Sequence, residues 1–281
     1  VKKYYDEHPD FYKMQYPLTE VSYISLQVVP SQADYKVALD EKNKAVAELR
    51  TATASNIEEV LRGYTTSSKF FSKTFLTGAE LDELGLGAEQ VAFIKGSEAG
   101  AVNDPQLVSD RYDVVKLVGK KMATSGVSVR MIVLSDSVKG QADSIMAQLN
   151  SGASFAELAK KHSLDQSTAA SGGLIQLPNR YGMVDSTFSE SKLIQIAQGS
   201  GLNLDTLYKV PVGTVVRLGR APISVLVRAE NPQPAVESYQ VAFVSIPATF
   251  SPETYNEKYA AMNRILGGGG GFEAMAKKAE K

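Results

Sequence analysis

The chain has 281 residues, of which 43% are hydrophobic and 22% are charged, and its formal net charge is -1. This composition is typical of a soluble globular protein with about two domains. The near-neutral balance argues against a nucleic-acid partner, because binding to phosphate backbones requires a clustered basic excess. The absence of cysteine excludes disulfides, thiolate metal sites and a cysteine nucleophile.

Both ends of the sequence indicate a fragment. The chain begins at Val1 rather than at a methionine, and it stops at Lys281 inside an expected helix. It shows neither a signal peptide nor the run of about 18–20 apolar residues that a membrane helix requires. We therefore interpret it as a piece whose targeting segment lies upstream. Residues 1–16 are polar and rich in aromatics, and we expect a helical connector there.

One order of elements occurs three times along the chain: a β-rich segment, a long helix, a polar break and a shorter helix. The units start about 100 residues apart, which is the period of a domain rather than of a solenoid. Helical spacing of apolar residues supports the helices. The strand and two helices of each unit are expected at 21–29, 32–50 and 57–64, at 127–134, 138–149 and 154–162, and at 237–246, 251–266 and 272–281.

Further β-rich segments close the first two units, at 112–120 and 213–229. One strand, several helices and then more strands predict an α+β fold, with helices packed on a small, mostly antiparallel sheet. The third unit stops after its second helix, so we expect it to lack closing strands. A run of glycines from Gly267 to Gly271 predicts a flexible break.

The second unit contains clear helix-end signals. Gly152 follows the first helix and suits a left-handed backbone conformation. Ser154 begins the next helix, and Glu157 stands three residues later, as in a capping box. Residues 189–204 are interpreted as an insertion.

The most specific pattern lies at 150–178, which reads NSGASFAELAKKHSLDQSTAASGGLIQLP. A G-x-x-F-x-x-L-A helix is followed by a serine, an aspartate, a loop of small residues and a double glycine. This ordered pattern closely resembles the parvulin-type (PpiC, or rotamase) family of peptidyl-prolyl isomerases. The resemblance depends on Gly152, Phe155, Leu158, Ala159, Ser163, Asp165, Ser167, Ala169, Gly172 and Gly173.

The arrangement of the units resembles periplasmic folding factors of the SurA and PpiD type. The resemblance implies tandem parvulin-like (FKBP-like) modules in a periplasmic protein, and it allows an inner-membrane anchor in an upstream segment. The expected division is a helical connector at 1–16, a degenerate parvulin-like module at 17–123, a clearer one at 124–230 and a partial third one at 231–281.

Rotation about an X-Pro bond faces a barrier of about 18–20 kcal/mol and needs no nucleophile, cofactor or metal. The resemblance implies an apolar cradle for the proline ring and a dry polar cluster around the twisted amide. Two facing histidines belong to that cluster, and their positions hold Met131 and Ser224 here. The resemblance assigns Asp165 to the acidic catalytic position and Met131, Ile175, Met183 and Phe188 to substrate binding.

Each of these residues also has a purely structural interpretation. Asp165 can cap the loop after its helix, and the apolar residues can belong to the core. The two histidines of the chain, His8 and His162, do not match the family positions. We expect His162 to interact with the C-terminal end of its helix and His8 to be exposed. Two isolated histidines leave nothing with which to build a zinc site or a Ser-His-Asp triad.

The resemblance therefore implies a periplasmic folding factor or chaperone that binds unfolded, extended or proline-containing polypeptide, and the replaced histidines imply weak or absent isomerase activity. The alternatives are a fully active prolyl isomerase and a set of non-catalytic scaffold or dimerisation modules. If the alignment is right, Met131→His combined with Ser224→His should move the second module toward activity. The oligomeric state is left open.

Overall fold

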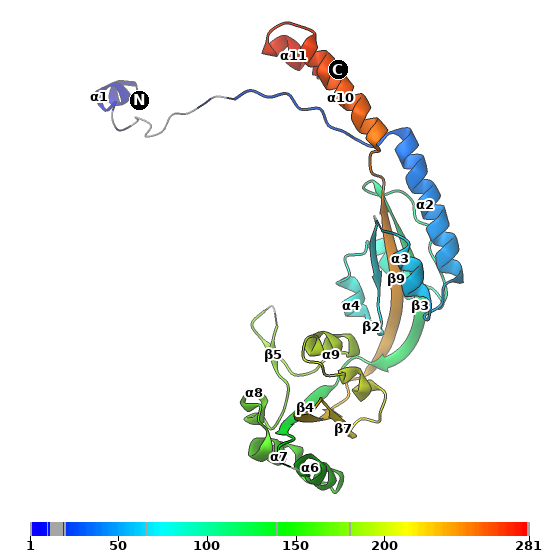
Figure 1. Cartoon of the computed structure of the whole chain (residues 1–281), viewed down its shortest axis with the longest axis vertical. Coiled ribbons are helices and arrows are strands. Elements are labelled where there is room, and N and C mark those ends of the chain that lie inside the picture. The colour runs from blue at the N-terminus through cyan, green and yellow to red at the C-terminus, as the bar shows by residue number, and fades with distance from the viewer. Residues whose placement is uncertain are drawn as a thin grey trace. The chain divides into compact units, whose positions relative to one another are not determined.

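The computed structural model describes residues 2–9, 11, 19, 21–65, 67–138, 140–179 and 181–279 (Figure 1). The expected connector at 1–16 lies partly outside these residues. The chain divides into a smaller unit, Val1–Ala38 with Ala248–Lys281, and a larger unit, Leu39–Pro247. The two units are described separately below.

The smaller unit is helical where it has regular structure. It contains α1 (Lys2–Glu7), the start of α2 (Gln32–Thr51), α10 (Pro252–Gly267) and α11 (Phe272–Ala279). The strand expected at 21–29 is wrong, because this segment has neither helix nor strand and leaves Val21, Tyr23 and Val29 exposed. A β-rich sequence becomes a strand only where a neighbouring strand supplies hydrogen bonds, and this segment pairs with no strand.

A buried carboxylate joins the starts of α2 and α10. Asp34 accepts hydrogen bonds from the Thr254 hydroxyl at 2.6 Å and from the Ser31 and Ser251 backbone N–H groups at 2.7 and 3.1 Å. These bonds, led by that of Thr254, hold the pKa of Asp34 far below its ordinary value. The carboxylate therefore stabilises two helix N-termini at once, where a negative charge is favourable.

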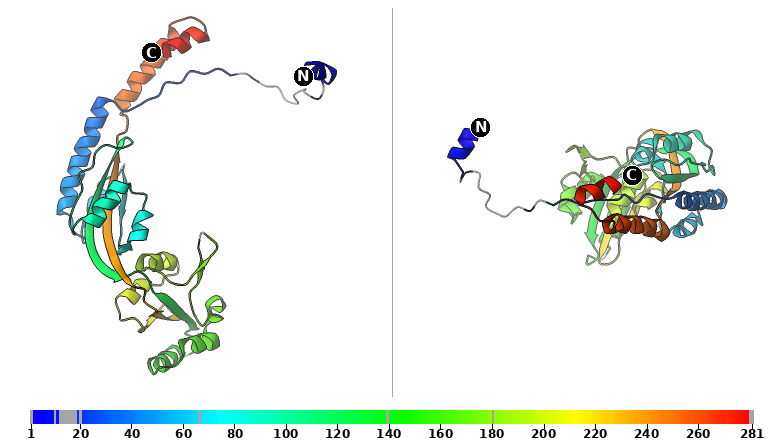
Figure 2. Two further views of the ribbon diagram at one scale, coloured as in Figure 1. Left: turned by 180° about the vertical axis from the view of Figure 1, so that it is seen from behind. Right: turned by 90° about the horizontal axis from the view of Figure 1, so that it is seen from above.

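The larger unit begins with an antiparallel sheet of four strands. The long strand β9 (Ala235–Pro247) pairs along its length with β3 (Arg111–Thr124), and also with β1 (Ser68–Phe71) and β2 (Leu76–Thr77). Figures 1 and 2 show β3 and β9 running side by side.

The side chains of β3 and β9 alternate between two layers of helices. One face packs with α4 (Gly78–Asp82) and α5 (Ala88–Gly96) in a cluster of buried residues. The opposite face carries Lys116, whose ammonium group donates to the Leu49 carbonyl of α2 at 2.8 Å. Helix α3 (Ile57–Arg62) follows α2. The cluster on the α4–α5 face comprises Leu76, Leu81, Ile94, Val115, Leu117, Tyr239 and Val241.

A three-stranded antiparallel sheet in the order β4-β8-β7 forms the second half of the larger unit. Its strands are β4 (Ser128–Ser135), β7 (Val215–Leu218) and β8 (Ile223–Glu230). The helices α6 (Gln141–Asn150) and α7 (Phe155–His162) cover one face. The other face packs against α9 (Glu190–Ala197), the 3-10 helix η1 (Leu204–Tyr208) and the segment from Ile175 to Phe188. This segment contains a short hairpin formed by β5 (Leu177–Pro178) and β6 (Val184–Asp185).

The two sheets are connected through the β3–β9 ribbon. Strand β3 leads into β4 through residues 125–127, and β8 returns into β9 through residues 231–234. Register partners flank both junctions, Thr124 with Ala235 and Ser128 with Glu230. The three-stranded sheet with its helices is thus an insertion between two paired strands.

This pairing bears on the expected module boundaries. In the division expected from the sequence, β3 lies at the end of a module at 17–123 and β9 at the start of a module at 231–281. In the structure β9 completes the sheet that contains β3, so the expected third strand–helix unit does not begin a separate sheet. The division into three tandem modules stays a prediction.

The α+β fold class is confirmed, with helices packed on small antiparallel sheets. The helices expected at 138–149 and 154–162 are α6 and α7, and the Ser154 hydroxyl accepts from the Glu157 N–H as a cap. The segment interpreted as an insertion, 189–204, contributes Leu193, Ala197 and Leu204 to the core.

Candidate functional site

The edge of β4 that faces away from β8 is occupied by three segments of the same chain. Val127 exchanges two backbone hydrogen bonds of 2.9 Å with Phe188. Farther along, the Met131 N–H donates to the Gly173 carbonyl at 2.8 Å, and the Leu164 N–H donates to the Val133 carbonyl at 2.8 Å. A further strand therefore cannot pair with β4 between Val127 and Val133.

The double glycine of the family motif lies directly against β4. Gly172 and Gly173 have φ values of +64° and +79°, a backbone conformation that favours glycine. A Cβ atom on Gly173 would lie 2.5 Å from the Met131 carbonyl oxygen. Arg130 fixes the loop through its guanidinium, which donates to the Gly172 carbonyl at 2.8 Å. Glycine is required here both by backbone conformation and by the close approach of the strand.

Asp165 is the N-cap of the short helix α8 (Gln166–Ala169). Its carboxylate accepts from the Ser167 and Thr168 hydroxyls at 2.6 Å each, and from the Ser167 N–H at 3.1 Å. Burial acts to raise the pKa of Asp165, but these hydrogen bonds outweigh it and the pKa is lowered. The geometry is that of a cap, and the three bonds engage both carboxylate oxygens.

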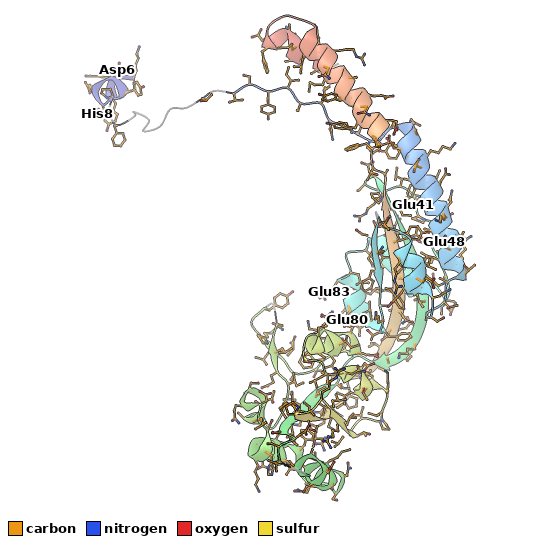
Figure 3. All side chains as sticks on the ribbon, viewed as in Figure 1. Asp6, His8, Glu41, Glu48, Glu80 and Glu83 are labelled. Atoms are coloured by element: carbon orange, nitrogen blue, oxygen red, sulfur yellow. The ribbon has the colours of Figure 1, made fainter. Side chains whose placement is uncertain are left out.

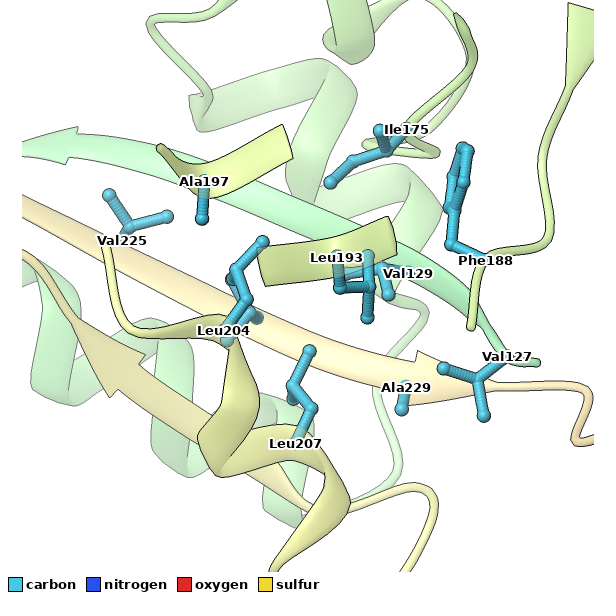
Figure 4. Close-up of a cluster of buried hydrophobic side chains, with 11 residues drawn as sticks. Val127, Val129, Ile175, Phe188, Leu193, Ala197, Leu204, Leu207, Val225 and Ala229 are labelled. Carbon is cyan, nitrogen blue, oxygen red and sulfur yellow. The ribbon is translucent and has the colours of Figure 1, made fainter. Parts of the chain in front are cut away.

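Three of the four residues predicted to bind substrate belong to one apolar cluster. Ile175 and Phe188 are buried in it, and Met131 packs against it from β4. Figure 4 shows Ile175 and Phe188 on neighbouring segments beside Leu193 of α9. The fourth, Met183, lies apart on the β5–β6 hairpin with 60% of its surface exposed. The structure does not bring all four residues to one open groove.

The two positions aligned with the family histidines do not face each other. Met131 is the register partner of Val227, whereas Ser224 is the partner of Leu134, on the opposite face of the sheet. The Ser224 hydroxyl donates to Asp136 at 2.5 Å and accepts from the Arg217 guanidinium at 2.7 and 3.0 Å. The residue that faces Met131 across the strands is Val227, so no imidazole stands at this pair.

The two histidines of the chain lie elsewhere. His162 is in the last turn of α7, as expected. His8 is exposed, stacks on Tyr4 with ring centroids 4.3 Å apart, and its Nδ1 lies 2.9 Å from the Tyr4 carbonyl oxygen. Among the described residues, no three histidine or acidic side chains come together as metal ligands. Within the same residues, no helix has the length and apolar character needed to cross a membrane.

A cavity of about 830 Å³ opens beside the apolar cluster of Figure 4. One wall comes from β2, α4 and Phe70, and Figure 3 labels Glu80 and Glu83 beside α4. The other wall comes from the β5–β6 hairpin, Phe188 and α9. We call this cavity the cleft, and its lining residues are Phe70, Leu76, Thr77, Ala79, Glu80, Glu83, Leu84, Leu177, Pro178, Asn179, Tyr181, Asp185, Thr187, Phe188, Ser189, Ser191, Lys192 and Gln195.

The hairpin wall presents apolar side chains to solvent. The Asn179 side chain organises its turn by accepting from the Tyr181 and Met183 N–H groups, both at 3.0 Å. Tyr181, Met183 and Val184 remain 70%, 60% and 61% exposed. An exposed apolar tip beside a partly apolar cavity is a surface suited to extended polypeptide.

Glu80 connects the two walls of the cleft. Its carboxylate accepts from the Thr77 N–H at 2.8 Å in a capping box at the start of α4. The same carboxylate accepts from the hydroxyls of Ser189, the N-cap of α9, and Ser191. One negative charge thus stabilises the N-termini of both helices.

The α4 wall of the cleft was not predicted from the sequence. A signal for it was available, because the sequence T-G-A-E at 77–80 is a capping-box pattern before an apolar run. The pattern predicts the start of a helix at Gly78. It does not predict that this helix lies beside the hairpin, since the contact joins residues more than a hundred positions apart.

Residues 112–208 match the family model of the PPIC-type PPIase domain. No curated protein matches the sequence. Similar solved structures include the foldase protein PrsA from Streptococcus pneumoniae str. Canada MDR_19A, at 16% identity and a TM-score of 0.28. That match covers 56% of this chain and 49% of the other, so this chain spans about half the length of that protein.

Two further structures are the peptidylprolyl isomerases (PrsA) from Bacillus anthracis and Bacillus cereus. The first is 13% identical and covers 89% of this chain and 94% of its own, and the second is 14% identical and covers 92% and 87%. Both have a TM-score of 0.28.

Proposed function

We propose that this chain, which belongs to the parvulin-type peptidyl-prolyl isomerase family through its PPIC-type domain at 112–208, is a folding factor that binds unfolded or proline-containing polypeptide. The single observation that supports this most is the cleft with its exposed hairpin tip. Apolar side chains that are exposed to solvent lower the free energy of unfolding. A binding role explains their presence on this surface.

The proposed mechanism is capture rather than efficient catalysis. Speeding X-Pro rotation requires polar groups held around the twisted amide in a dry pocket. The facing pair on the central strands is Met131 and Val227, and the Asp165 carboxylate is engaged by the hydroxyls of Ser167 and Thr168. An apolar surface of this kind binds a proline ring but offers little stabilisation to a rotating amide. We therefore expect weak or absent isomerase activity.

Two further parts of the proposal rest on the family alone. They are a periplasmic location and an anchor to the inner membrane in a segment upstream of this sequence. Fractionation of the full natural protein, followed by extraction of membranes with carbonate, tests both.

Client binding is tested by the aggregation of an unfolded model protein, followed by light scattering. We expect the chain to slow aggregation, and we expect Tyr181→Ser combined with Met183→Ser to remove most of this effect. Because both side chains are largely exposed, the double variant should keep its stability within about 0.5 kcal/mol. A matched control is Val108→Ser combined with Val138→Ser, since these side chains are 57% and 55% exposed and lie outside the cleft.

Absence of any effect of the native chain at several-fold molar excess would refute client binding. Isomerase activity is tested separately with a protease-coupled assay on proline peptides. We expect a rate close to that of buffer; a rate that scales with protein concentration and rises by orders of magnitude would establish the fully active isomerase instead.

A further inference from the structure

Residues 21–29 form an extended segment whose backbone hydrogen-bonding groups are open. The segment is part of the blue trace that leads into α2 in Figure 1, and it contains neither helix nor strand. Within the described part of the chain, its N–H and carbonyl groups make no hydrogen bond to other backbone groups. An extended stretch with open N–H and carbonyl groups is a template on which another strand can pair.

The side chains of this segment alternate as they do along a strand. Ile24, Leu26 and Val28 are half-buried, whereas the residues that alternate with them are exposed, Tyr23 to 81%. This period of two is that of a β-strand. Residues 21–33 contain no charged side chain, so a strand that pairs here meets neither attraction nor repulsion from a local charge.

The same sequence pattern forms a paired strand elsewhere in the chain. Residues 22–30 read SYISLQVVP, and residues 238–247 of β9 read SYQVAFVSIP. Both stretches begin with Ser-Tyr, end with proline and are followed by a long helix. Strand β9 pairs with β3, β1 and β2, and each of these pairings is antiparallel. Residues 21–29 therefore have the sequence of a strand that pairs in this way, but they have no partner strand in the described structure.

From these observations we infer that residues 21–29 bind an extended segment of the client by antiparallel strand pairing. The inference rests on the proposed client binding and names how a second part of the client is held. The occupant is a client segment rich in β-branched and other apolar residues, because these residues favour strands and pack on the alternating apolar side chains of the segment. Backbone groups provide the contact, so the exact client sequence matters little.

A pairing of two strands needs a second point of attachment, because two strands without further packing are only marginally stable. A client that is also held in the cleft has this second point on the same chain. Its attachment raises the local concentration of the neighbouring client residues at 21–29. Strand pairing is closed to the client at the edge of β4 between Val127 and Val133, whereas the backbone of residues 21–29 is open.

The inference is tested by hydrogen exchange of the whole chain with and without a peptide. The probe is an uncharged fluorescent peptide of about 20 residues in which valine and leucine alternate with threonine and serine. We expect exchange of the amides at 21–29 to slow by about tenfold or more at saturating peptide. The affinity, measured by fluorescence anisotropy, should change less than about twofold between low and high salt, because no charge takes part.

The variant that tests the backbone directly is Ser25→Pro combined with Val28→Pro. It removes one N–H donor from each edge of the segment, and proline is compatible with an extended backbone. The peptide should bind about tenfold more weakly, since the paired hydrogen bonds are lost. The unfolding midpoint should stay unchanged, because neither N–H makes a backbone hydrogen bond within the described residues. The matched control is Ser25→Ala combined with Val28→Ala, which keeps both N–H groups and should bind within about twofold of the native chain.

Four results would overturn the inference while leaving client binding intact. The first is a bound peptide without slower exchange at 21–29, and the second is a proline variant that binds as tightly as its alanine control. The third is slower exchange that appears without peptide as the protein concentration rises, which would assign the segment to a second copy of the chain. The fourth is faster exchange in β9 as exchange at 21–29 slows, which would indicate strand exchange within the chain. If the peptide does not bind the native chain at all, client binding itself fails.

Discussion

At the scale of single residues, the parvulin-like motif serves the local backbone. Asp165 holds α8 through the Ser167 and Thr168 hydroxyls, and Gly173 lets the loop approach Met131. Both residues stabilise the path of the chain in this loop. Their presence therefore indicates the family fold, and it does not by itself indicate catalysis.

The cap formed by Asp165 makes stability depend on pH. Its pKa is lowered in the folded protein, so the unfolded state binds the proton more readily. The stabilisation is complete above the unfolded-state pKa, at about pH 4, and is lost as the pH falls through the folded-state pKa. Asp165→Ala should cost about 1 kcal/mol near pH 7, and Asp165→Asn should cost less, since asparagine also caps helices.

The measurement is urea unfolding of the native chain and Asp165→Ala at a series of pH values. The difference in free energy of unfolding should diminish as the pH falls below about 4, the unfolded-state pKa. A difference that stays constant over this range would show that the carboxylate charge is irrelevant to the cap.

The close approach at Gly173 predicts a large loss on adding one methyl group. Gly173→Ala combines a positive φ of +79° with a Cβ only 2.5 Å from a backbone oxygen, and should cost about 2–4 kcal/mol. Gly140→Ala is the matched control, because its φ is +77° and no atom lies within 4 Å of the added Cβ. It should cost about 1–2 kcal/mol from backbone strain alone. Equal losses in denaturant unfolding would contradict the packing argument.

At the scale of elements, local sequence signals predicted the features that short-range interactions form. The Ser154 cap and the apolar spacing of α6 and α7 are short-range features, and the structure confirms them. The segment 21–29 carries the same β-forming residues as true strands, but it pairs with no partner, and composition alone cannot show this. The pairing of β3 with β9 joins positions more than a hundred residues apart, which no local pattern encodes.

The candidate site shows the same difference between features set by short-range contacts and features set by long-range contacts. The resemblance assigned Ile175 and Phe188 to substrate binding, and the structure places both in one buried cluster, while their binding role stays a prediction. Met183 was predicted beside them, but the hairpin carries it into solvent. The α4 wall of the cleft depends on long-range contacts, so it could not be predicted from the motif.

The contact between α4 and α9 should appear as an energetic coupling. The Ser191 hydroxyl donates to Glu80, and a hydrogen bond to a carboxylate contributes about 1.5–3 kcal/mol. A double-mutant cycle of Glu80→Ala and Ser191→Ala should therefore give a coupling of at least about 1 kcal/mol. The control cycle of Glu80→Ala with Ser144→Ala, an α6 residue hydrogen-bonded to Gln148, should be additive within about 0.5 kcal/mol. Additive losses in the first cycle would show that the two helices do not stabilise each other.

At the scale of the larger unit, the chain is organised as an insertion rather than as a row of separate sheets. Thr124 and Ala235 are register partners at the point where β3 and β9 reach the inserted domain. Hydrogen bonds continue through the junction, where the Gln233 N–H donates to the Gly126 carbonyl at 2.9 Å. The four-stranded sheet has its own apolar cluster, separate from those of the inserted domain.

The insertion predicts that the four-stranded sheet folds without the inserted domain. Replacing residues 125–234 by Asn-Gly would join β3 to β9 as an ordinary hairpin, because this dipeptide favours the tight turns that match strand twist. We expect circular dichroism to show strand and helix signals and a cooperative thermal transition. A chain without a transition would indicate that the two sheets form one folding unit.

The central claim is that extended polypeptide binds in the cleft, between α4 and the β5–β6 hairpin. The most direct measurement is a titration of the methyl-labelled chain with an apolar peptide, followed by nuclear magnetic resonance. We predict that the methyl signals of Leu84, Leu177 and Met183 shift, whereas those of Leu149 and Leu158, in the α6–α7 cluster on the other face of the sheet, do not. Shifts confined to the α6–α7 face, or no shifts at saturating peptide, would contradict the account.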